Sequence, residues 1–437
     1  MSQEPFAATA LVYASAQLEW SVPHVPDDLL GIGRKGRGSM KITDLKCATI
    51  GSHLVLRIVT DEGIDGFSQS ESSKPYLKDP ILRLKDFIVG EDPTDVERVV
   101  RKIRQRGAAK PWGTPVSMIE MALWDVAGKA AGLPVYKLLG GKVRDRVLVY
   151  NGAIRMPWES YTPDGFAAAG AWMKALPQRF KFVKQGIAYH GDMKHELGFL
   201  LGDLMGEMHH GWPVAGTLSE RGIAHVYDCV AAMREALGPD IGLALDCGPG
   251  FSIPDAIRLA RALEPLNPMW MEDLLTGDYV PWPGADLYRE VTTQTTIPIH
   301  TGEQLYLRQS FKELIEGKAV NIVGPDPCDA GGIAELKWIA EYADLHGILM
   351  APHGTGDGLF GLAALVQVSA TMPGNYIAFE LPTANPSWWF DIVEGLPDPL
   401  VVDSFIQVWD RPGIGIEFRV EEARRYLADD ERDFFDN

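Results

Sequence analysis

The chain contains 437 residues and carries a formal net charge of −18, with 41 basic against 59 acidic residues and a pI near 5.0. So large an acidic excess repels phosphate backbones and anionic lipid surfaces, which excludes nucleic acid and membranes as main partners. Hydrophobic residues make up 46% and charged residues 23%, which is ordinary for a globular protein and excludes wholesale disorder. The length predicts several domains, or one large barrel with an added domain.

The spacing of the cysteines and the lengths of the apolar runs indicate the cellular compartment. The four cysteines lie too far apart for CxxC pairs, so neither a disulfide framework nor a zinc knuckle is predicted. They are Cys47, Cys229, Cys247 and Cys328. No apolar run approaches the roughly 18 residues that a membrane helix needs. A mildly apolar stretch over residues 6–16 follows an acidic residue, Glu4, and no basic one, which argues against a secretion signal. We therefore expect a cytoplasmic protein.

The N-terminal part of the chain divides into an extension and a first domain. Residues 1–39 end in a basic, glycine-rich stretch and are interpreted as an extension: a lid, an arm or a poorly ordered tail. A first domain is predicted over residues 41–145. It opens with a β-meander over residues 41–70, because alternating apolar residues are interrupted by a turn-forming Asp-Glu-Gly.

One helix of this first domain has clear boundaries. The sequence predicts Thr114 as its N-cap, Pro115 at its first helical position and Gly132 as its end. Its faces are apolar all round, which predicts burial between two layers.

From residue 146 to 381 the pattern alternates between short apolar runs and helical stretches. The runs are 147–154, 180–186, 241–247, 269–274, 297–303, 320–326, 348–353 and 376–381. Strands separated by helical connections pair in parallel, and eight of them close a barrel. Residues 188–222 form an insertion within it, since the third connection is too long for one helix. Residues 382–437 are predicted to return to the first domain.

Ionisable residues occur at the end of each predicted strand from the second to the eighth. They are Lys184, Asp246, Glu272, Glu303, Asp326, His353 and Glu380. Active sites of barrels lie at the carboxyl ends of the strands, so these side chains should converge at one mouth. Such a convergence is costly without a counter-charge, which favours a site over a structural role.

Three consecutive carboxylates, those of Asp246, Glu272 and Glu303, come from adjacent strands. Adjacent strands are about 4.8 Å apart, so the oxygens can meet on one hard cation, and Mg²⁺ fits best. The alternative is that each carboxylate caps a helix or pairs with a basic residue. We favour that alternative for any one of them, and a metal site for the three together.

Lys184 precedes this trio along the barrel, while Asp326 and His353 follow it. A base on each side of a metal-bound substrate is suited to removing a proton next to a carboxylate, because the metal stabilises the ene-diolate that forms. Asp326 can orient His353. Taken alone, His353 is better explained as a helix cap, and Lys184 as a surface residue at a strand edge.

At this point the sequence resembles the enolase superfamily, in particular its mandelate racemase-like subgroup. The resemblance covers about residues 41–420 and rests on four segments: 113–125, 138–141, 326–333 and 352–354. It implies a (β/α)8-like barrel of the modified (β/α)7β type, with an α+β capping domain built from both ends of the chain. It also implies that Asp246, Glu272 and Glu303 bind Mg²⁺.

The same resemblance assigns proton-transfer roles. It implies Lys184 as one acid/base and His353, paired with Asp326, as the other. Glu380 matches the residue that hydrogen-bonds the substrate carboxylate as charge builds up.

The sequence departs from this subgroup at two places. Phe182 stands where the second strand often has another lysine, a loss that weakens carboxylate binding or raises the pKa of Lys184. The insertion 188–222 carries histidines that either reach the substrate or belong to a solvated or oligomer-contacting lid. They are His190, His195, His209 and His210.

We therefore expect a Mg²⁺-dependent sugar-acid dehydratase that forms a 2-keto-3-deoxy acid, acts on a small-molecule carboxylate and assembles as a homo-oligomer. A racemase, epimerase or cycloisomerase shares the first step and is the close alternative. A Schiff-base aldolase using Lys184 and a non-catalytic sugar-acid-binding protein are the more distant ones.

Overall fold

The computed structural model describes residues 39–71, 74–105, 113–152, 160–189, 199–201, 217–275, 284–354, 358–381 and 387–436. The predicted N-terminal extension, apart from residue 39, and the four histidines of the insertion lie outside the described residues.

The first sheet is the predicted β-meander. Its strands β1 (Ile42–Ile50), β2 (His53–Thr60) and β3 (Gly66–Gln69) pair antiparallel in the order β1-β2-β3. Helices follow it in chain order: α1 (Lys78–Arg83), α2 (Lys85–Ile88), α3 (Val96–Gln105), α4 (Thr114–Ala131) and α5 (Val135–Leu138). Their apolar faces and those of β1 and β2 form one core cluster.

Helix α4 connects this layer to the barrel. It is buried between β2, β3 and α3 on one side and α11 (Ile333–Leu345) on the other, as predicted, and it ends at Gly132 with a φ of 68°. The predicted N-cap was wrong. Gly113 is the N-cap, while Thr114 is the first helical residue and its hydroxyl donates to Asp329. Thr114 already lies inside the helix, and an N-cap residue precedes the first helical position.

Eight parallel strands form the barrel. They are β4 (Arg146–Asn151), β5 (Phe182–Gly186), β8 (Gly242–Asp246), β9 (Met271–Glu272), β10 (Ile299–Thr301), β11 (Ile322–Val323), β12 (Leu349–Met350) and β13 (Phe379–Leu381). At one end of the sheet β13 pairs with β4, and at the other end lies β12. The sheet closes on itself where Met350 of β12 bridges to Tyr376, in the segment just before β13. The Glu380 amide also donates to Pro352 O at 3.0 Å.

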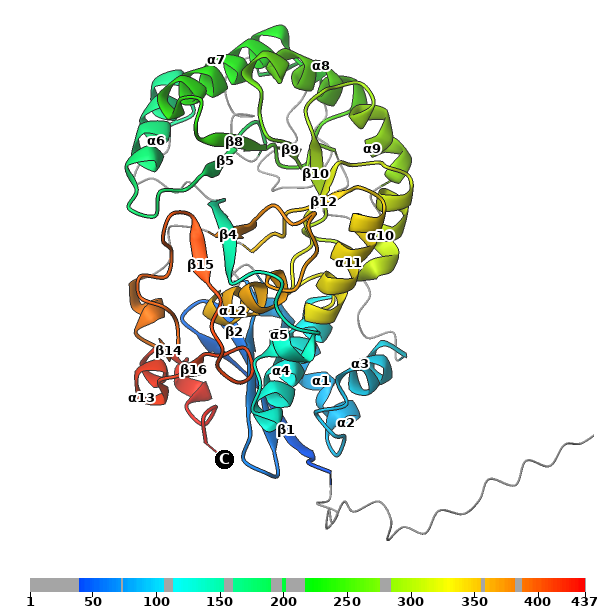
Figure 1. The fold of residues 1–437 in the computed structure, drawn as a ribbon, viewed down its shortest axis with the longest axis vertical. Coiled ribbons are helices and arrows are strands. Elements are labelled where there is room, and N and C mark those ends of the chain that lie inside the picture. The colour runs from blue at the N-terminus through cyan, green and yellow to red at the C-terminus, as the bar shows by residue number, and fades with distance from the viewer. Residues whose placement is uncertain are drawn as a thin grey trace, which may run out of the picture. The chain divides into compact units, whose positions relative to one another are not determined.

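One helix follows each strand except the last, and Figure 1 shows these helices as an arc outside the strands. They are α6 (Pro163–Ala175), α7 (Glu220–Leu237), α8 (Ile253–Leu263), α9 (Ala285–Thr292), α10 (Leu307–Glu316), α11 and α12 (Gly358–Ser369). Seven strand–helix units and a final strand confirm the predicted (β/α)7β barrel with its α+β cap. Between β5 and α7, the short strands β6 (Leu200–Leu201) and β7 (Thr217–Leu218) pair antiparallel.

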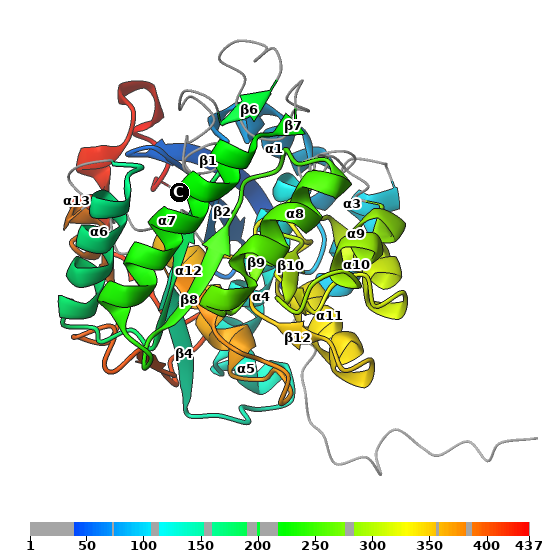
Figure 2. The ribbon, with the colours of Figure 1, turned by 90° about the horizontal axis from the view of Figure 1, so that it is seen from above.

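The C-terminal segment lies against both layers. Strand β15 (Phe405–Gln407) pairs antiparallel with β4, and β14 (Val393–Glu394) pairs with β16 (Glu417–Phe418). After α13 (Val420–Ala423), the chain end lies beside β1 and β2 (Figure 2), where the Arg57 guanidinium donates to Phe434 O at 2.9 Å. The boundaries 41–145, 146–381 and 382–437 remain our proposed division of the chain.

The cap is fixed to the barrel by helix α4. The Glu120 carboxylate accepts the backbone N–H groups of Ile333 at 2.7 Å and Ala334 at 2.9 Å, at the start of α11. The Ser117 hydroxyl accepts from the Gly331 amide at 3.0 Å. A cap side chain therefore satisfies the N-terminus of the helix that follows the sixth barrel strand.

Candidate active site

The predicted site residues all lie at the carboxyl ends of barrel strands and are all buried. Lys184, Asp246, Glu272 and Glu380 lie within strands β5, β8, β9 and β13, and Glu303, Asp326 and His353 follow β10, β11 and β12 within three residues. None is more than 7% exposed. Because parallel strand ends meet at one edge, residues far apart in sequence share this mouth.

Lys184 pairs with three carboxylates. Its Nζ lies 3.1 Å from Asp246 Oδ2 and 3.3 Å from Glu380 Oε2, and it donates to Glu272 Oε1. Burial disfavours the ammonium, but Glu272, Glu380 and Asp246 together outweigh it and hold the pKa of Lys184 well above its usual value. Lys184 is therefore a charged proton donor in this arrangement.

His353 occupies the opposite side of the mouth. Its Nδ1–H donates to Asp326 Oδ2 at 2.6 Å, which leaves Nε2 facing inward, 3.3 Å from Glu303 Oε2. Burial lowers the pKa of the imidazole, but Glu303, Glu380 and Asp326 outweigh it and raise that pKa well above its usual value.

Glu380 lies between these two groups. Its Oε2 is 3.3 Å from Lys184 Nζ and 3.6 Å from His353 Nε2. Room for the carboxylate depends on Gly152, since a Cβ there would collide with the Glu380 side chain. A lysine and a histidine thus approach one carboxylate from two sides.

Acidic groups outnumber basic ones at this mouth. Among the described residues, Glu272, Asp273 and Glu303 bring oxygens within 4.8 Å of one another, a group able to hold a metal ion. Asp246 is not part of that group; its Oδ2 pairs with Lys184 instead. Burial raises the pKa of Glu272 to about 8, although the nearby charge of Lys184 lowers it. Repulsion from the carboxylates of Asp246, Glu380 and Glu303 adds to the increase. So crowded a set of hard oxygens fits a divalent cation.

Comparisons with known proteins identify the family of the chain. The mandelate racemase / muconate lactonizing enzyme N-terminal domain matches residues 42–140, and the enolase C-terminal domain-like family matches residues 201–423. The chain belongs to this enolase-superfamily group, the mandelate racemase family. The predicted resemblance is confirmed.

Individual members of the mandelate racemase family match along almost their whole length. D-xylonate dehydratase of Haloferax volcanii is 31% identical over 91% of this chain and 92% of its own, and D-galactonate dehydratase of Variovorax paradoxus is 29% identical over 88% and 93%. The crystal structure of a mandelate racemase/muconate lactonizing enzyme-like protein from Rubrobacter xylanophilus superposes with a TM-score of 0.76 at 30% identity, covering 90% of this chain and 98% of the other.

An apolar layer lies beneath the charged mouth of this family member. Its residues are Tyr150, Phe182, Ala244, Trp270, Ile322, Ala351 and Ala378. Phe182, the residue found in place of a lysine, stacks on Tyr150 with ring centroids 4.9 Å apart and meets Trp270 edge-on at 5.6 Å. Phe182 is therefore part of the barrel floor, one inward-facing position below Lys184.

Sequence reasoning missed three residues at the site. Asp273 directly follows Glu272, so the strand-end criterion would have found it if extended by one residue. His300 is neutral, because burial lowers its pKa to about 3, and its Nε2–H donates to Ala351 O at 3.0 Å. Trp270 Nε1 donates to Glu272 Oε2 at 2.8 Å. No short motif signals the last two: Trp270 contacts a residue two positions further along the chain, and His300 contacts Ala351, 51 residues further along.

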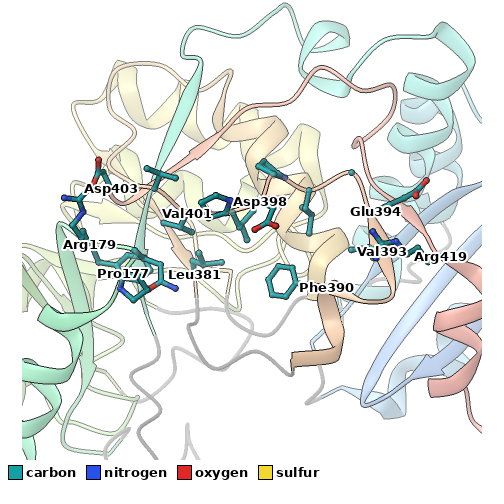
Figure 3. A pocket seen from close by; sticks show the side chains of 18 residues that line it. Pro177, Arg179, Leu381, Phe390, Val393, Glu394, Asp398, Val401, Asp403 and Arg419 are labelled. Carbon is teal, nitrogen blue, oxygen red and sulfur yellow. The ribbon is translucent and has the colours of Figure 1, made fainter.

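A hollow that none of the predicted site residues lines lies between residues 177–180 and the segment 393–403 (Figure 3). Its volume is about 730 Å³. Two of its charged side chains, Arg179 and Asp403, pair with each other at 2.5 Å. The charged mouth thus remains the better candidate for chemistry. In the part of the chain that the structure describes, no helix combines the length and apolarity needed to cross a membrane.

Proposed function

We propose that this protein is a Mg²⁺-dependent sugar-acid dehydratase that converts its substrate to a 2-keto-3-deoxy acid. The observation that carries the proposal is the placement of Lys184 Nζ and His353 Nε2 on either side of the Glu380 carboxylate, at 3.3 Å and 3.6 Å. Two proton-transfer groups at one point suit a reaction that takes one proton and returns another. The matching relatives named D-xylonate dehydratase and D-galactonate dehydratase support the same reaction class.

The acidic residues fit a divalent cation. Asp246, Glu272 and Glu303 would hold it, with Asp273 beside them, because buried carboxylates in this number need more positive charge than Lys184 and His353 supply. When bound, Mg²⁺ would supply electrostatic stabilisation of the negative charge that develops on the substrate carboxylate.

The chain's own residues account for the proton movements. With a cation held by Asp246, Glu272 and Glu303, these carboxylates would stabilise the protonated forms of Lys184 and His353 less. Either group, in its neutral form, then takes the proton from the carbon next to the carboxylate. Glu380, in its protonated form, donates a hydrogen bond to the substrate carboxylate as charge builds up. The β C–O bond then breaks, and the protonated His353 gives its proton to the departing hydroxyl, which leaves as water. The enol that remains takes a proton at the β carbon, loses the proton of its hydroxyl at the α carbon and becomes the 2-keto-3-deoxy acid.

A screen of sugar acids tests the proposal. The purified protein with Mg²⁺ should form a 2-keto acid, detected as its semicarbazone, from one stereochemical series. Chelation with EDTA should abolish turnover and Mg²⁺ should restore it. Asp246→Asn should raise the Mg²⁺ concentration needed for half-maximal activity by about 10-fold or more, because a neutral amide is a poorer ligand for a hard cation. Full turnover in EDTA would overturn the metal assignment.

The alternatives give different results in the same screen. A racemase or epimerase would exchange the α-proton in D₂O and return an isomeric acid without forming a 2-keto acid. A Schiff-base aldolase would be trapped on Lys184 by borohydride in the presence of substrate and would keep its activity in EDTA. A binding protein would show neither exchange nor product.

A further inference from the structure

A segment of the cap lies against the barrel mouth next to His353. It comprises Gln69, the last residue of strand β3, and the described residues Ser70, Glu71 and Lys74 that follow it. Gln69 fixes its start: its carbonyl oxygen accepts from Cys328 Sγ at 3.1 Å, and its side-chain oxygen accepts from the Phe360 amide at 3.2 Å. The segment therefore contacts both the sixth and the seventh strand–helix units of the barrel.

Lys74 anchors the other end of this segment. Its Nζ donates to Asp329 Oδ2 and lies 3.4 Å from Glu71 Oε2. Thr114 donates to the other oxygen of Asp329, so a second cap residue holds the same carboxylate. The Lys74 side chain is only 11% exposed. A buried lysine with two carboxylate partners is a defined contact rather than a solvated surface pair.

Glu71 reaches the acid/base pair itself. One oxygen of Glu71, one of Asp326 and a ring nitrogen of His353 lie within 4.8 Å of one another. Glu71 is 9% exposed, and Asp326 is fully buried. Burial raises the pKa of Glu71 to about 7 against the attraction of Lys74, with Asp329 and Asp326 adding repulsion. The imidazole thus has acidic groups behind it as well as in front of it.

We propose that Glu71 is a positioning residue for the His353–Asp326 pair, and that Lys74 holds Glu71 in place from the cap. A second acidic group on the Asp326 side of the ring favours the orientation in which Nδ1–H points to Asp326 and Nε2 faces the mouth. The ammonium of Lys74 reduces the electrostatic repulsion between the carboxylates of Glu71 and Asp329, and so stabilises this arrangement. The inference rests on the proposed function for what His353 does, whereas the positioning itself rests on these contacts.

Four variants test the positioning role. Glu71→Gln and Lys74→Met should impair proton transfer by His353. Lys74→Arg, which keeps the positive charge, should retain most of it. Lys129→Met is the matched control: Lys129 is 14% exposed and pairs with Asp125 and Glu417 at 2.8 Å, away from the mouth. The readout is α-proton exchange in D₂O with two sugar acids epimeric at the α carbon, which present their protons to opposite sides. Glu71→Gln should lower exchange from the His353 side by about 10- to 100-fold and leave exchange from the Lys184 side unchanged.

Equal losses on both sides, or an equal loss in Lys129→Met, would overturn the inference, because they indicate a general structural role. A second readout needs no substrate. At one fixed pH, the ¹⁵N signals of the His353 ring, assigned through His353→Asn, should shift in Glu71→Gln and stay in place in Lys129→Met. Unshifted signals in Glu71→Gln would refute the positioning role. If the wild type exchanges no α-proton in any sugar acid, the proposed function fails, and these signals still decide the inference.

Discussion

Along five strands of the barrel, an apolar side chain and a charged one enter the interior two positions apart. The pairs are Phe182 and Lys184, Ala244 and Asp246, Trp270 and Glu272, Ala351 and His353, and Ala378 and Glu380. Residues two apart on a strand face the same side, so the first members form a lower layer and the second members an upper layer. Both layers are buried, yet one is apolar and the other is charged.

The comparison shows that burial alone does not set the chemistry of a barrel interior. The lower layer is closed by stacked rings, with Tyr150, Phe182 and Trp270 within 5.6 Å of one another. It excludes water from below the upper layer, where charges then interact strongly because the local dielectric is low. Burying the charges of the upper layer costs desolvation energy. We expect this cost to be offset because the charges pair with one another and with a bound cation.

Removing the central cation of the upper layer should have the largest effect. Lys184→Met should lower turnover with Mg²⁺ by about 10⁴-fold, equivalent to about 5 kcal/mol, because it removes a proton-transfer group. Steady-state kinetics on the best substrate measures this loss. Lys129→Met controls for the removal of a buried, paired lysine elsewhere, and retention of a tenth of wild-type turnover would contradict the role of Lys184.

Placing a charge in the lower layer should sharpen the contrast between the layers. Phe182→Lys introduces an ammonium between Tyr150 and Trp270 and should lower the free energy of unfolding by about 3 to 5 kcal/mol. Phe182→Leu keeps the layer apolar and should cost about 1 to 2 kcal/mol. Urea denaturation measures both. Equal stability of the two variants would show that the lower layer accepts charge as the upper one does.

Filling the space beside Glu380 should damage the upper layer selectively. In Gly152→Ala the new Cβ collides with the Glu380 side chain, and displacement of that carboxylate should reduce kcat by about 100-fold. The control is Gly374→Ala, because a Cβ at Gly374 has no neighbour within 4 Å. If Gly152→Ala had wild-type kcat, the position of Glu380 would not matter to catalysis.

The pH dependence of stability should report the neutral His300, which stacks on Trp270 with centroids 5.4 Å apart. Burial lowers its pKa to about 3, whereas an unfolded histidine titrates near 6.5. Between these values the unfolded chain binds more protons, so this stability is present above about pH 6.5 and is lost as the pH falls.

The expected loss from His300 is about 2 kcal/mol between pH 6.5 and 5. Urea denaturation of wild type and His300→Gln at both pH values isolates it, because the variant lacks the titrating group. The difference in stability between the two proteins should change by this amount. A difference that is independent of pH would show that His300 is not held neutral by burial.

Much of the fold and of the candidate site follows from local sequence pattern. The alternation of apolar runs and helical stretches predicted the strands to within a few residues. Reading the strand ends selected Lys184, His353 and Glu380, which the structure brings together, but it missed Asp273 beside Glu272. The metal ligands and the acid/base roles remain predictions. Thr114 was misassigned because the helix begins one residue earlier than its sequence signals suggest, with Gly113 as the N-cap; its hydroxyl donates to Asp329, 215 residues further along the chain.

By itself, the sequence determined which residues end the strands, because period-two alternation and strand length are local properties of the chain. Only the tertiary structure decided their partners. Closing the barrel brings Glu380 to Lys184, 196 residues away in sequence, and docking the cap brings Glu71 to His353 and Asp326. Such contacts depend on strand register and on the packing of α4 against α11. These are properties of several elements at once, so no single segment of sequence encodes them.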